Sequence, residues 1–379
     1  MPHIDTSLAA RWRLLAIFAA QGVVTAMLFM RIPDLQLRAG LSDAELGIVL
    51  MGGPIGAMAT FALATRLIER FGTRKVVLFA YPLMALSAAL LVFPTAPITL
   101  FALLLVFGAS NSASNIAINV EADRVEAGTG TRIMNRCHGM WSVVFFVSSL
   151  LAGIIRGAHI DPTLHLWILF PLFSAASLAL TWPMTEFPQR TTGTRARKFA
   201  LPTLAVIALV AFGLGAELLE GASRVWATIY IRDVFDVPAL VESAALPALV
   251  LAMAAIRLVA DRIVDRHGPR RIAGLALSIA IAGLAIVVCA GNAYLAIAGF
   301  AIAGIGASVV YPLMVSAAAR LGDRPASENV AALTLVVQMV MLISPAIIGA
   351  VAEGFGIRAA FGMLLPMLIL GLAMSRTLK

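Results

Sequence analysis

Long apolar runs separated by short polar breaks fill most of this sequence. The runs reach about 20 residues, the length that a helix needs to cross the hydrocarbon core of a membrane. None shows the alternating apolar and polar positions of membrane β-strands. Breaks such as Asp161-Pro162 and Gly291-Asn292 separate the runs. The pattern predicts twelve helices, at about 13–32, 45–66, 74–93, 97–121, 132–155, 164–183, 201–231, 239–264, 271–290, 293–318, 328–352 and 358–377.

The composition supports an all-α integral membrane protein. Hydrophobic residues make up 61% of the 379 residues and charged residues 13%. In soluble domains, about 45–50% of the residues are apolar and about 25% are charged. A soluble fold of this composition would expose large apolar patches. Arg11 and Arg13 precede an apolar run from Leu14 to Met30 that is long enough to span, with no small-residue cleavage site after it. We therefore expect a retained first helix rather than a signal peptide.

Basic residues are concentrated on one predicted side of the membrane. Both termini and the loops after the second, fourth, sixth, eighth and tenth helices fall on that side and hold most of the Lys and Arg residues. The opposite side holds only Arg31, Arg38, Arg156, Arg232 and Arg358. This bias predicts a multi-pass protein of the cytoplasmic (inner) membrane with both termini in the cytoplasm. It also explains the formal net charge of +8, so we expect no nucleic-acid partner.

The sequence repeats itself at about half its length. The segment from Arg66 to Lys75 matches the segment from Arg262 to Arg271, and the offset from Glu69 to Asp265 is 196 residues. The same offset pairs Gly108 with Gly304 and Arg124 with Arg320. The repeat predicts two parallel six-helix halves. We assign residues 1–185 to an N-terminal bundle, 186–199 to a cytoplasmic linker and 200–379 to a C-terminal bundle.

The repeated loop resembles the G-x-x-x-D-R-x-G-R-R signature of the major facilitator superfamily. The first copy reads Glu69-Arg70-Phe71-Gly72-Thr73-Arg74-Lys75, with Glu69 in the place of the usual aspartate, and the second runs from Asp265 to Arg271. The resemblance implies a twelve-helix carrier of two pseudo-symmetric bundles, with the solute site between them near the membrane midplane. An acid that pairs with arginines and a helix N-terminus would close the cytoplasmic side. The predicted gating residues are Glu69, Arg70, Gly72, Arg74, Asp265, Arg266, Gly268 and Arg270.

Ionisable side chains within membrane helices are costly and usually functional. Glu217, Glu220 and Arg224 lie at i, i+3 and i+7 of the helix at 201–231, and therefore share one face. A carboxyl group in an apolar site can bind and release a proton near neutral pH. We predict proton coupling at Glu220 first, and at Glu121 and Glu217 as further candidates. The alternatives are a static Glu220–Arg224 ion pair and a Glu121 that only joins the charges of the neighbouring loop.

Amide side chains form a stripe on the helix at 97–121. Asn111, Asn115 and Asn119 follow one another at four-residue steps. By the family resemblance, the first, fourth, seventh and tenth helices line the cavity, and each of them carries a polar candidate. Amides and hydroxyls beside an aromatic ring suit a hydroxyl-rich or amino-substituted solute, although asparagines also join helices to one another. The predicted solute-binding residues are Gln21, Asn115, Asn119, Trp141, Glu220, Tyr311 and Gln338.

Three short stretches resemble the MosC/YbjJ-like branch of the superfamily, which is related to sugar–proton symporters. They are Asn119-Val120-Glu121, the segment from His138 to Ser142, and Glu220-Gly221-Ala222. This resemblance implies proton-coupled transport of a sugar-, polyol- or amino-sugar-like solute by alternating access. The alternatives are efflux of a drug or metabolite by proton antiport, and a non-transporting membrane sensor on the same fold. The fourth helix lacks the arginine of proton antiporters, which favours the first reading over efflux.

The remaining chemistry excludes most other functions. No nucleophile–base constellation, phosphate loop or Cys/His metal spacing occurs, so we expect no enzyme, no metal and no cofactor. Cys137 and Cys289 lie far apart in the sequence, and we expect both to be reduced. The predicted partners are a small-molecule solute, protons and the lipid bilayer, and the predicted oligomeric state is a monomer.

Overall fold

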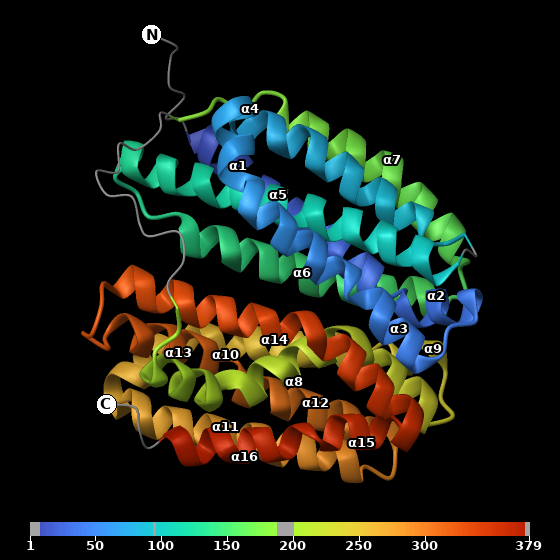
Figure 1. Cartoon of the computed structure of the whole chain (residues 1–379). Coiled ribbons are helices and arrows are strands. Elements are labelled where there is room, and N and C mark those ends of the chain that lie inside the picture. The colour runs from blue at the N-terminus through green and yellow to red at the C-terminus, as the bar shows by residue number, and fades with distance from the viewer. Residues whose placement is uncertain (1–7, 94–95, 188–200, 376–379) are drawn as a thin grey trace. The chain divides into compact units, whose positions relative to one another are not determined.

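The computed structural model describes residues 8–93, 96–187 and 201–375, which form helices and no strand (Figure 1). Contacts divide the chain into two compact units, Met1–Gly193 and Thr194–Lys379. The helices of unit 1 are α1 Leu8–Phe29, α2 Ile32–Ala39, α3 Asp43–Leu50, α4 Gly52–Leu90, α5 Pro97–Thr129, α6 Met134–Gly157 and α7 Pro162–Thr181. Those of unit 2 are α8 Leu204–Val234, α9 Ala239–Glu242, α10 Ala245–His267, α11 Pro269–Cys289, α12 Ala293–Ala307, α13 Val310–Ala319, α14 Ala326–Phe355, α15 Ile357–Gly362 and α16 Leu364–Met374.

The described residues contain twelve helical segments that are long and apolar enough to cross a membrane, which confirms the predicted number. We number them spans 1–12. Spans 2 and 3, at Asp43–Phe61 and Arg66–Leu90, both lie within α4 and the short α3 before it. Most of the predicted linker, from residue 188 onward, lies outside the described residues, but Glu186 and Phe187 are placed.

Side-chain caps fix where several helices begin. Ser42 and Glu45 form a reciprocal capping box at the start of α3. The Asn292 side chain accepts a hydrogen bond from the backbone N–H of Leu295 at 2.9 Å and starts α12. The fourth predicted helix was too short, because α5 continues to Thr129 and ends only at Gly130, a left-handed C-cap with φ of 66°.

The repeated loop has the same backbone form in both units. Gly72 (φ 79°, ψ 161°) turns the chain within α4, near the start of span 3, and Gly268 (φ 83°, ψ 147°) turns it between spans 8 and 9. This backbone region is essentially confined to glycine. The glycine of the motif is therefore required by the turn itself. We call the end of each unit that carries this loop its basic end.

The internal repeat also governs how the spans pack. A Cβ atom on Gly108 would lie 2.7 Å from the Cα atom of Gly53, and one on Gly304 would lie 2.6 Å from the carbonyl oxygen of Leu249. Leu249 stands 196 residues after Gly53, the offset of the sequence repeat. Small residues allow such close helix approach in membranes. The structure thus confirms that the two halves share one packing plan.

Span 10 is broken near its middle, where the sequence predicts one helix. The helix α12 ends at Ala307 and α13 begins at Val310. Pro312 explains the break, because a proline has no N–H and its ring clashes with the carbonyl group four residues earlier. That carbonyl group belongs to Ser308, whose oxygen is left for another donor. Broken helices of this kind commonly mark binding sites in transporters.

Candidate functional site

A chain of hydrogen-bonded amides links three helices of unit 1. Gln21 of α1 is buried, and its Nε2 donates to the carbonyl oxygen of Asn111 at 2.9 Å and to Ser114 Oγ at 3.2 Å. Asn115 Nδ2 donates to Gln21 Oε1 at 3.3 Å. Asn119 Nδ2 donates to Asn115 Oδ1 at 3.3 Å. The asparagine stripe of α5 therefore does contact a neighbouring helix, as expected for residues that join helices.

The chain continues to α6 through His138, whose Nε2 lies 3.1 Å from Asn119 Oδ1. We call Gln21, Asn115, Asn119 and His138 the amide ladder. Asn115 and His138 are exposed, and Asn119 is half-buried. The ladder is thus internally bonded at its Gln21 end and accessible at the other three residues, so that it can offer donors and acceptors to a bound molecule.

Trp141 lies beside the ladder on α6. Its ring stacks on Phe145 with 5.1 Å between the ring centroids. The backbone of α6 approaches α1 at Gly22, where a Cβ atom would lie 3.0 Å from the carbonyl oxygen of Trp141. Trp141 is half-buried, so its position allows both packing and contact with a solute.

Unit 2 carries a charged cluster instead of amides. Glu220 of α8 forms ion pairs with Arg224, one turn later on the same helix, and with Arg257 of α10, whose Nη2 lies 3.3 Å from Glu220 Oε2. The sequence interpretation included the first pair, and the structure confirms it. Glu217 lies within electrostatic range of the cluster but forms no ion pair with a described residue. We call Glu220, Arg224 and Arg257 the charged cluster.

Arg257 was missed in the sequence analysis. It lies near the C-terminal end of span 8, Ala239–Ala260, and a charged side chain within a membrane span is costly. That cost was the available signal. Its Nε donates to the Ser308 carbonyl oxygen at 3.1 Å, the same oxygen that Pro312 releases from the helix. The charged cluster is therefore attached directly to the break in span 10.

Two more predicted residues lie in the same unit. Tyr311 follows the break, and its hydroxyl interacts with that of Thr334 on α14. Gln338 is exposed on α14, one turn after Thr334. Tyr311 is also within electrostatic range of Glu217. Hydroxyl groups from two helices thus meet just after the break in span 10, and one of them, Tyr311, lies near the carboxylate of Glu217.

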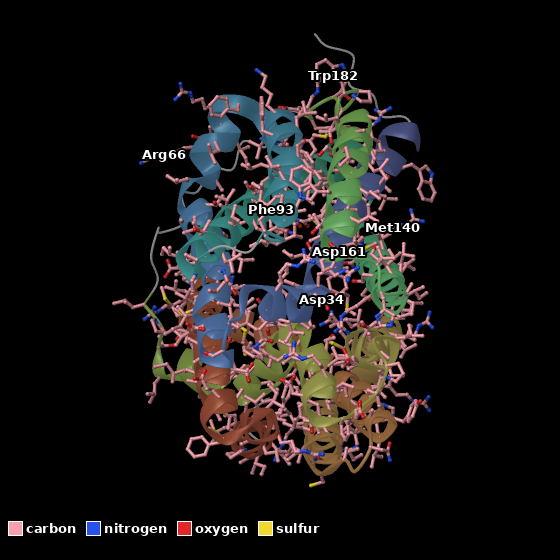
Figure 2. All side chains as sticks on the ribbon, turned by 90° about the vertical axis from the view of Figure 1, so that its right-hand side faces the viewer. Asp34, Arg66, Phe93, Met140, Asp161 and Trp182 are labelled. Atoms are coloured by element: carbon pink, nitrogen blue, oxygen red, sulfur yellow. The ribbon has the colours of Figure 1, made fainter. Side chains whose placement is uncertain are left out.

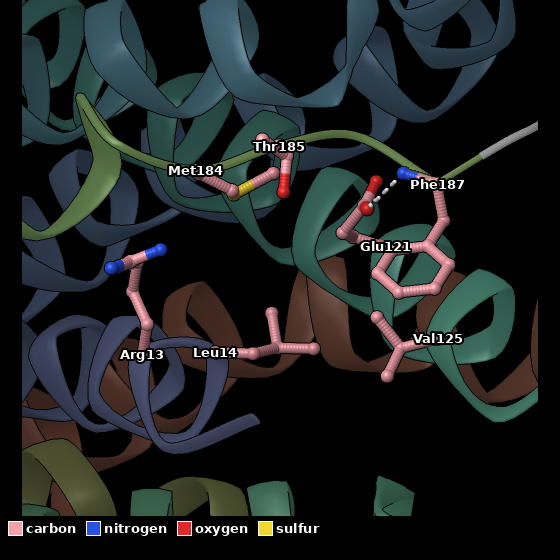
Figure 3. A pocket seen from close by; sticks show the side chains of 7 residues that line it. All are labelled: Arg13, Leu14, Glu121, Val125, Met184, Thr185 and Phe187. Carbon is pink, nitrogen blue, oxygen red and sulfur yellow. Dashed lines mark hydrogen bonds between the residues drawn. The ribbon is translucent and has the colours of Figure 1, made fainter. Parts of the chain in front are cut away.

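At the basic end of unit 1, Glu121 is the centre of a buried network rather than part of an open loop. Its Oε2 accepts a hydrogen bond from Thr73 Oγ1 at 2.6 Å and lies 3.6 Å from Arg124 Nη1. Its Oε1 accepts from the backbone N–H of Phe187 at 2.8 Å. Figure 3 shows this last bond beside a small pocket that Arg13, Leu14, Val125, Met184 and Thr185 also line. Glu121 thus joins span 4, the repeated loop and the segment after span 6.

The acid that meets the start of the helix after the Gly72 turn is Glu186, not Glu69. Glu186 Oε1 accepts a hydrogen bond from the backbone N–H of Arg74 at 2.9 Å, a favourable position for a negative charge. Glu69 is exposed and pairs with no arginine among the described residues. Arg70 and Arg74 instead stack over Phe71 and Trp182. In the second loop, Asp265, Arg266 and Arg270 are all exposed.

The opposite end of unit 1 holds a buried ion-pair network, and Figure 2 looks onto the end that carries it. Asp34 pairs with Arg31 through Oδ2 at 2.7 Å and with Arg156 through Oδ1 at 2.8 Å. Arg31 Nε also donates to His165 Nδ1 at 3.0 Å. These contacts hold α2 against the ends of α6 and α7.

A second, exposed pair lies close to this network. Arg38 Nη2 lies 2.5 Å from Asp161 Oδ2. Hydrogen bonds from Thr163, and then the Arg38 guanidinium, lower the pKa of the Asp161 carboxyl group from 3.8 to about 2. Asp161 also accepts from the backbone N–H of Thr163 at 2.7 Å, which caps α7.

Cys137 and Cys289 are both free thiols, as predicted. Among the residues that the structure describes, no three His, Cys, Asp or Glu side chains gather in a way that could hold a metal ion.

The family model of the Major Facilitator Superfamily matches residues 14–339 and, again, 225–378. The chain is 28% identical to the transporter y4wD of Sinorhizobium fredii (strain NBRC 101917 / NGR234) over 92% of this chain and 93% of that protein. It is 27% identical to the membrane protein MosC of Rhizobium meliloti over 90% and 84%, which confirms the resemblance to MosC seen in the short motifs.

Solved structures agree on the fold. The nucleoside transporter NupG matches with a TM-score of 0.73 and 14% identity, covering 99% of this chain and 98% of NupG. A D-xylose–proton symporter matches with a TM-score of 0.69 and 14% identity, covering 97% and 96%. At such low identity these matches establish the architecture alone.

Proposed function

Since this chain belongs to the major facilitator superfamily of secondary transporters, we propose that it moves a small polar solute across the membrane by alternating access, together with protons. The solute is sugar-, polyol- or amino-sugar-like. The observation that carries the proposal is the charged cluster, because a carboxylate held between two arginines inside membrane spans has no role in lipid packing. Among solved proteins with this fold, the D-xylose–proton symporter carries a polar sugar together with protons.

Glu220 is the proposed coupling group. Arg224 and Arg257 stabilise its ionised form by direct pairing. A change that separates Glu220 from either arginine lowers that stabilisation and favours the protonated form. The carboxylate can therefore alternate between an ion-paired state and a protonated state, which is what a proton-coupled carrier requires. Glu217, one turn earlier, is the proposed second coupling group.

Solute contacts are proposed within each unit separately, at the amide ladder in unit 1 and at the hydroxyl groups near the break in unit 2. Asn115 and Asn119 offer both donors and acceptors, as does Gln338, and Tyr311 offers a hydroxyl. Gln21 supports Asn115 from behind, and Trp141 provides an apolar face beside the ladder. In unit 1, amides beside an aromatic face, and in unit 2, hydroxyl groups with an amide, each suit a compound with many hydroxyl groups.

The basic ends of both units are proposed to face the cytoplasm, with both termini inside, in the inner membrane. The excess of arginine at these ends supports this orientation. The repeated loops at Gly72 and Gly268 then serve as cytoplasmic gating segments. A green fluorescent protein fused to the C-terminus should fluoresce, and a dark but inserted fusion would contradict the orientation.

The coupling proposal is tested with Glu220→Gln in proteoliposomes. Candidate sugars, polyols and amino sugars are first screened by thermal shift, because a ligand stabilises the states that it binds. For a compound that shifts the melting temperature, the variant should lose accumulation driven by a proton gradient and retain solute exchange. Exchange persists because the amide ladder is unchanged.

Glu217→Gln and Glu121→Gln serve as comparisons. If Glu220 is the main coupling group, Glu217→Gln weakens accumulation less, and Glu121→Gln leaves its pH dependence unchanged. A Glu220→Gln protein that still concentrates the solute with unaltered pH dependence would show that the coupling assignment is wrong.

A further inference from the structure

The two arginines around Glu220 carry more N–H donors than the Glu220 carboxylate accepts. Arg257 donates its Nε to Ser308 and its Nη2 to Glu220, and Arg224 donates its Nη2 to Glu220. Each guanidinium has five N–H donors. Within the described residues, the remaining donors of Arg224 and Arg257 have no acceptor. The two guanidinium groups could therefore bind a second carboxylate in addition to that of Glu220.

Accessibility points the same way. The side chains of Arg224 and Arg257 are 37% and 43% exposed, whereas that of Glu220 is 13% exposed. Arginines within membrane spans almost always face protein or water-filled space rather than lipid. The N–H donors of Arg224 and Arg257 that do not bind Glu220 are therefore accessible to a molecule that arrives from water. The Glu220 carboxylate is more buried than either guanidinium group.

We propose that Arg257 and Arg224 form a binding site for a carboxylate group of the transported solute, which replaces Glu220 on Arg257. Guanidinium groups bind carboxylates through paired, parallel N–H donors, which gives both affinity and orientation. The solute is then a sugar acid or a related polyhydroxy acid, because the hydroxyl groups of Tyr311 and Thr334 beside the break in span 10 can bind its remaining hydroxyls. This inference rests on the proposed transport function and narrows its solute class.

The position of Arg257 makes the exchange possible. Its Nε remains on the Ser308 carbonyl oxygen, so the guanidinium keeps its place while its Nη atoms change partners. The groups around the exchanged contact are Glu217 and Arg224 on α8 and Tyr311 on α13. When the solute takes Arg257, Glu220 loses one of its two cations, so an acidic solute and a proton would enter together.

The test compares acids with neutral compounds of the same shape. The pairs are D-glucuronate and D-glucose, D-galacturonate and D-galactose, and D-gluconate and D-glucitol, each added to the purified full-length protein at constant ionic strength. At least one acid should raise the melting temperature by several degrees more than its neutral partner. Arg257→Gln should lower the apparent affinity for that acid at least tenfold, and Arg257→Lys should restore only part of it.

Arg358→Gln is the matched control. Arg358 also belongs to unit 2, but its guanidinium donates only to the carbonyl oxygens of Val288 and Ala290 in the described structure, so this variant should bind the acid like the unmodified protein. Glu220→Gln should bind the acid more tightly than the unmodified protein, because the competing carboxylate is gone. This second variant decides the matter if Arg257→Gln does not fold.

The proposal is overturned if neutral compounds bind as well as their acids, if no acid of the panel binds, or if both Arg257→Gln and Glu220→Gln leave acid binding unchanged. Proteoliposomes separate this failure from that of the transport function. An acid that binds through Arg257 without being accumulated contradicts proton-coupled transport alone. Accumulation of the neutral partner, independent of Arg257, contradicts the acid site alone.

Discussion

The two copies of the repeated loop have the same backbone and different anchors. Gly72 and Gly268 adopt nearly the same φ and ψ angles. In unit 1, Thr73 donates to Glu121, whereas the equivalent positions 196 residues later hold Pro269 and Ala317. Neither of these residues can form that bond. The repeat has thus kept the turn, which only glycine allows, and has not kept the polar contacts around it.

The same contrast occurs at the opposite ends of the two units. In unit 1, Asp34 pairs with Arg31 and Arg156. In unit 2, Arg358 donates to the backbone oxygens of Val288 and Ala290. At this end, Asp34 of unit 1 thus depends on charged partners, whereas Arg358 of unit 2 binds backbone oxygens. Changes of charge should then weaken unit 1 far more than unit 2.

The largest expected effect is that of Glu121→Ala. The substitution leaves Arg124 buried without its carboxylate and removes the acceptors of Thr73 and Phe187. Breaking a buried pair from one side costs about 3–5 kcal/mol. The melting temperature of the purified protein should fall by many degrees, or the protein should not accumulate in the membrane.

The control for this experiment is Glu69→Ala in the same loop. Glu69 is exposed, and such substitutions usually change stability by less than about 0.5 kcal/mol. Equal losses in the two variants would mean that the buried network at Glu121 is not what holds the loop.

A smaller effect is the difference in stability between two glycine variants. Gly72→Ala should destabilise the protein more than Gly268→Ala. In both loops the backbone strain costs about 1–3 kcal/mol. A Cβ atom on Gly72 would also lie 2.6 Å from Glu186 Oε2, whereas one on Gly268 would have no neighbour within 4 Å. Moving Glu186 off the Arg74 N–H should cost about 0.5–1.5 kcal/mol more.

A double substitution isolates that difference. In a Glu186→Ala background, Gly72→Ala should become no more costly than Gly268→Ala, as judged by melting temperatures. If the two glycine substitutions are already equal in the unmodified protein, the loops are anchored alike and the comparison fails.

The smallest expected effect is the dependence of protein stability on low pH through Asp161. The carboxyl group of Asp161 has a lower pKa in the folded protein, about 2, than its ordinary value of 3.8. Its contribution to stability is therefore complete above about pH 4 and is lost as the pH falls toward 2. The difference in melting temperature between the unmodified protein and Asp161→Asn should be constant above pH 4 and shrink below it.

Arg358→Gln provides the counterpart in unit 2. Its partners are backbone carbonyl groups, which do not titrate, so its effect should not change with pH over the same range. A pH-dependent loss in Arg358→Gln, or none in Asp161→Asn, would contradict the contrast between the two units.

The spans, the repeat and the turns could be predicted from the sequence because each depends on a local pattern. Twenty apolar residues predict a span, and a glycine at the same place in two halves predicts the turn at Gly72 and Gly268. The break in span 10 has a local cause as well, Pro312, but an apolar run gives no sign of whether a proline bends a helix or interrupts it.

The site was predicted in part. Glu220 and Arg224 share a helix, so their spacing was sufficient to pair them. Arg257 approaches from another helix, and only the fold brings it to Glu220. Glu121 is a second residue whose contacts depend on the fold. Its position near other charges in the sequence does not reveal that Thr73 and Phe187 bind its carboxylate.

The bond from Phe187 to Glu121 has a consequence for synthesis. Every partner of the Glu121 carboxylate described above lies within the first 187 residues of the chain. A ribosome that has delivered these residues to the membrane has therefore supplied all of those partners before the first helix of the second half is made. The buried Glu121 carboxylate can therefore form these contacts during translation, before the C-terminal half has been synthesised.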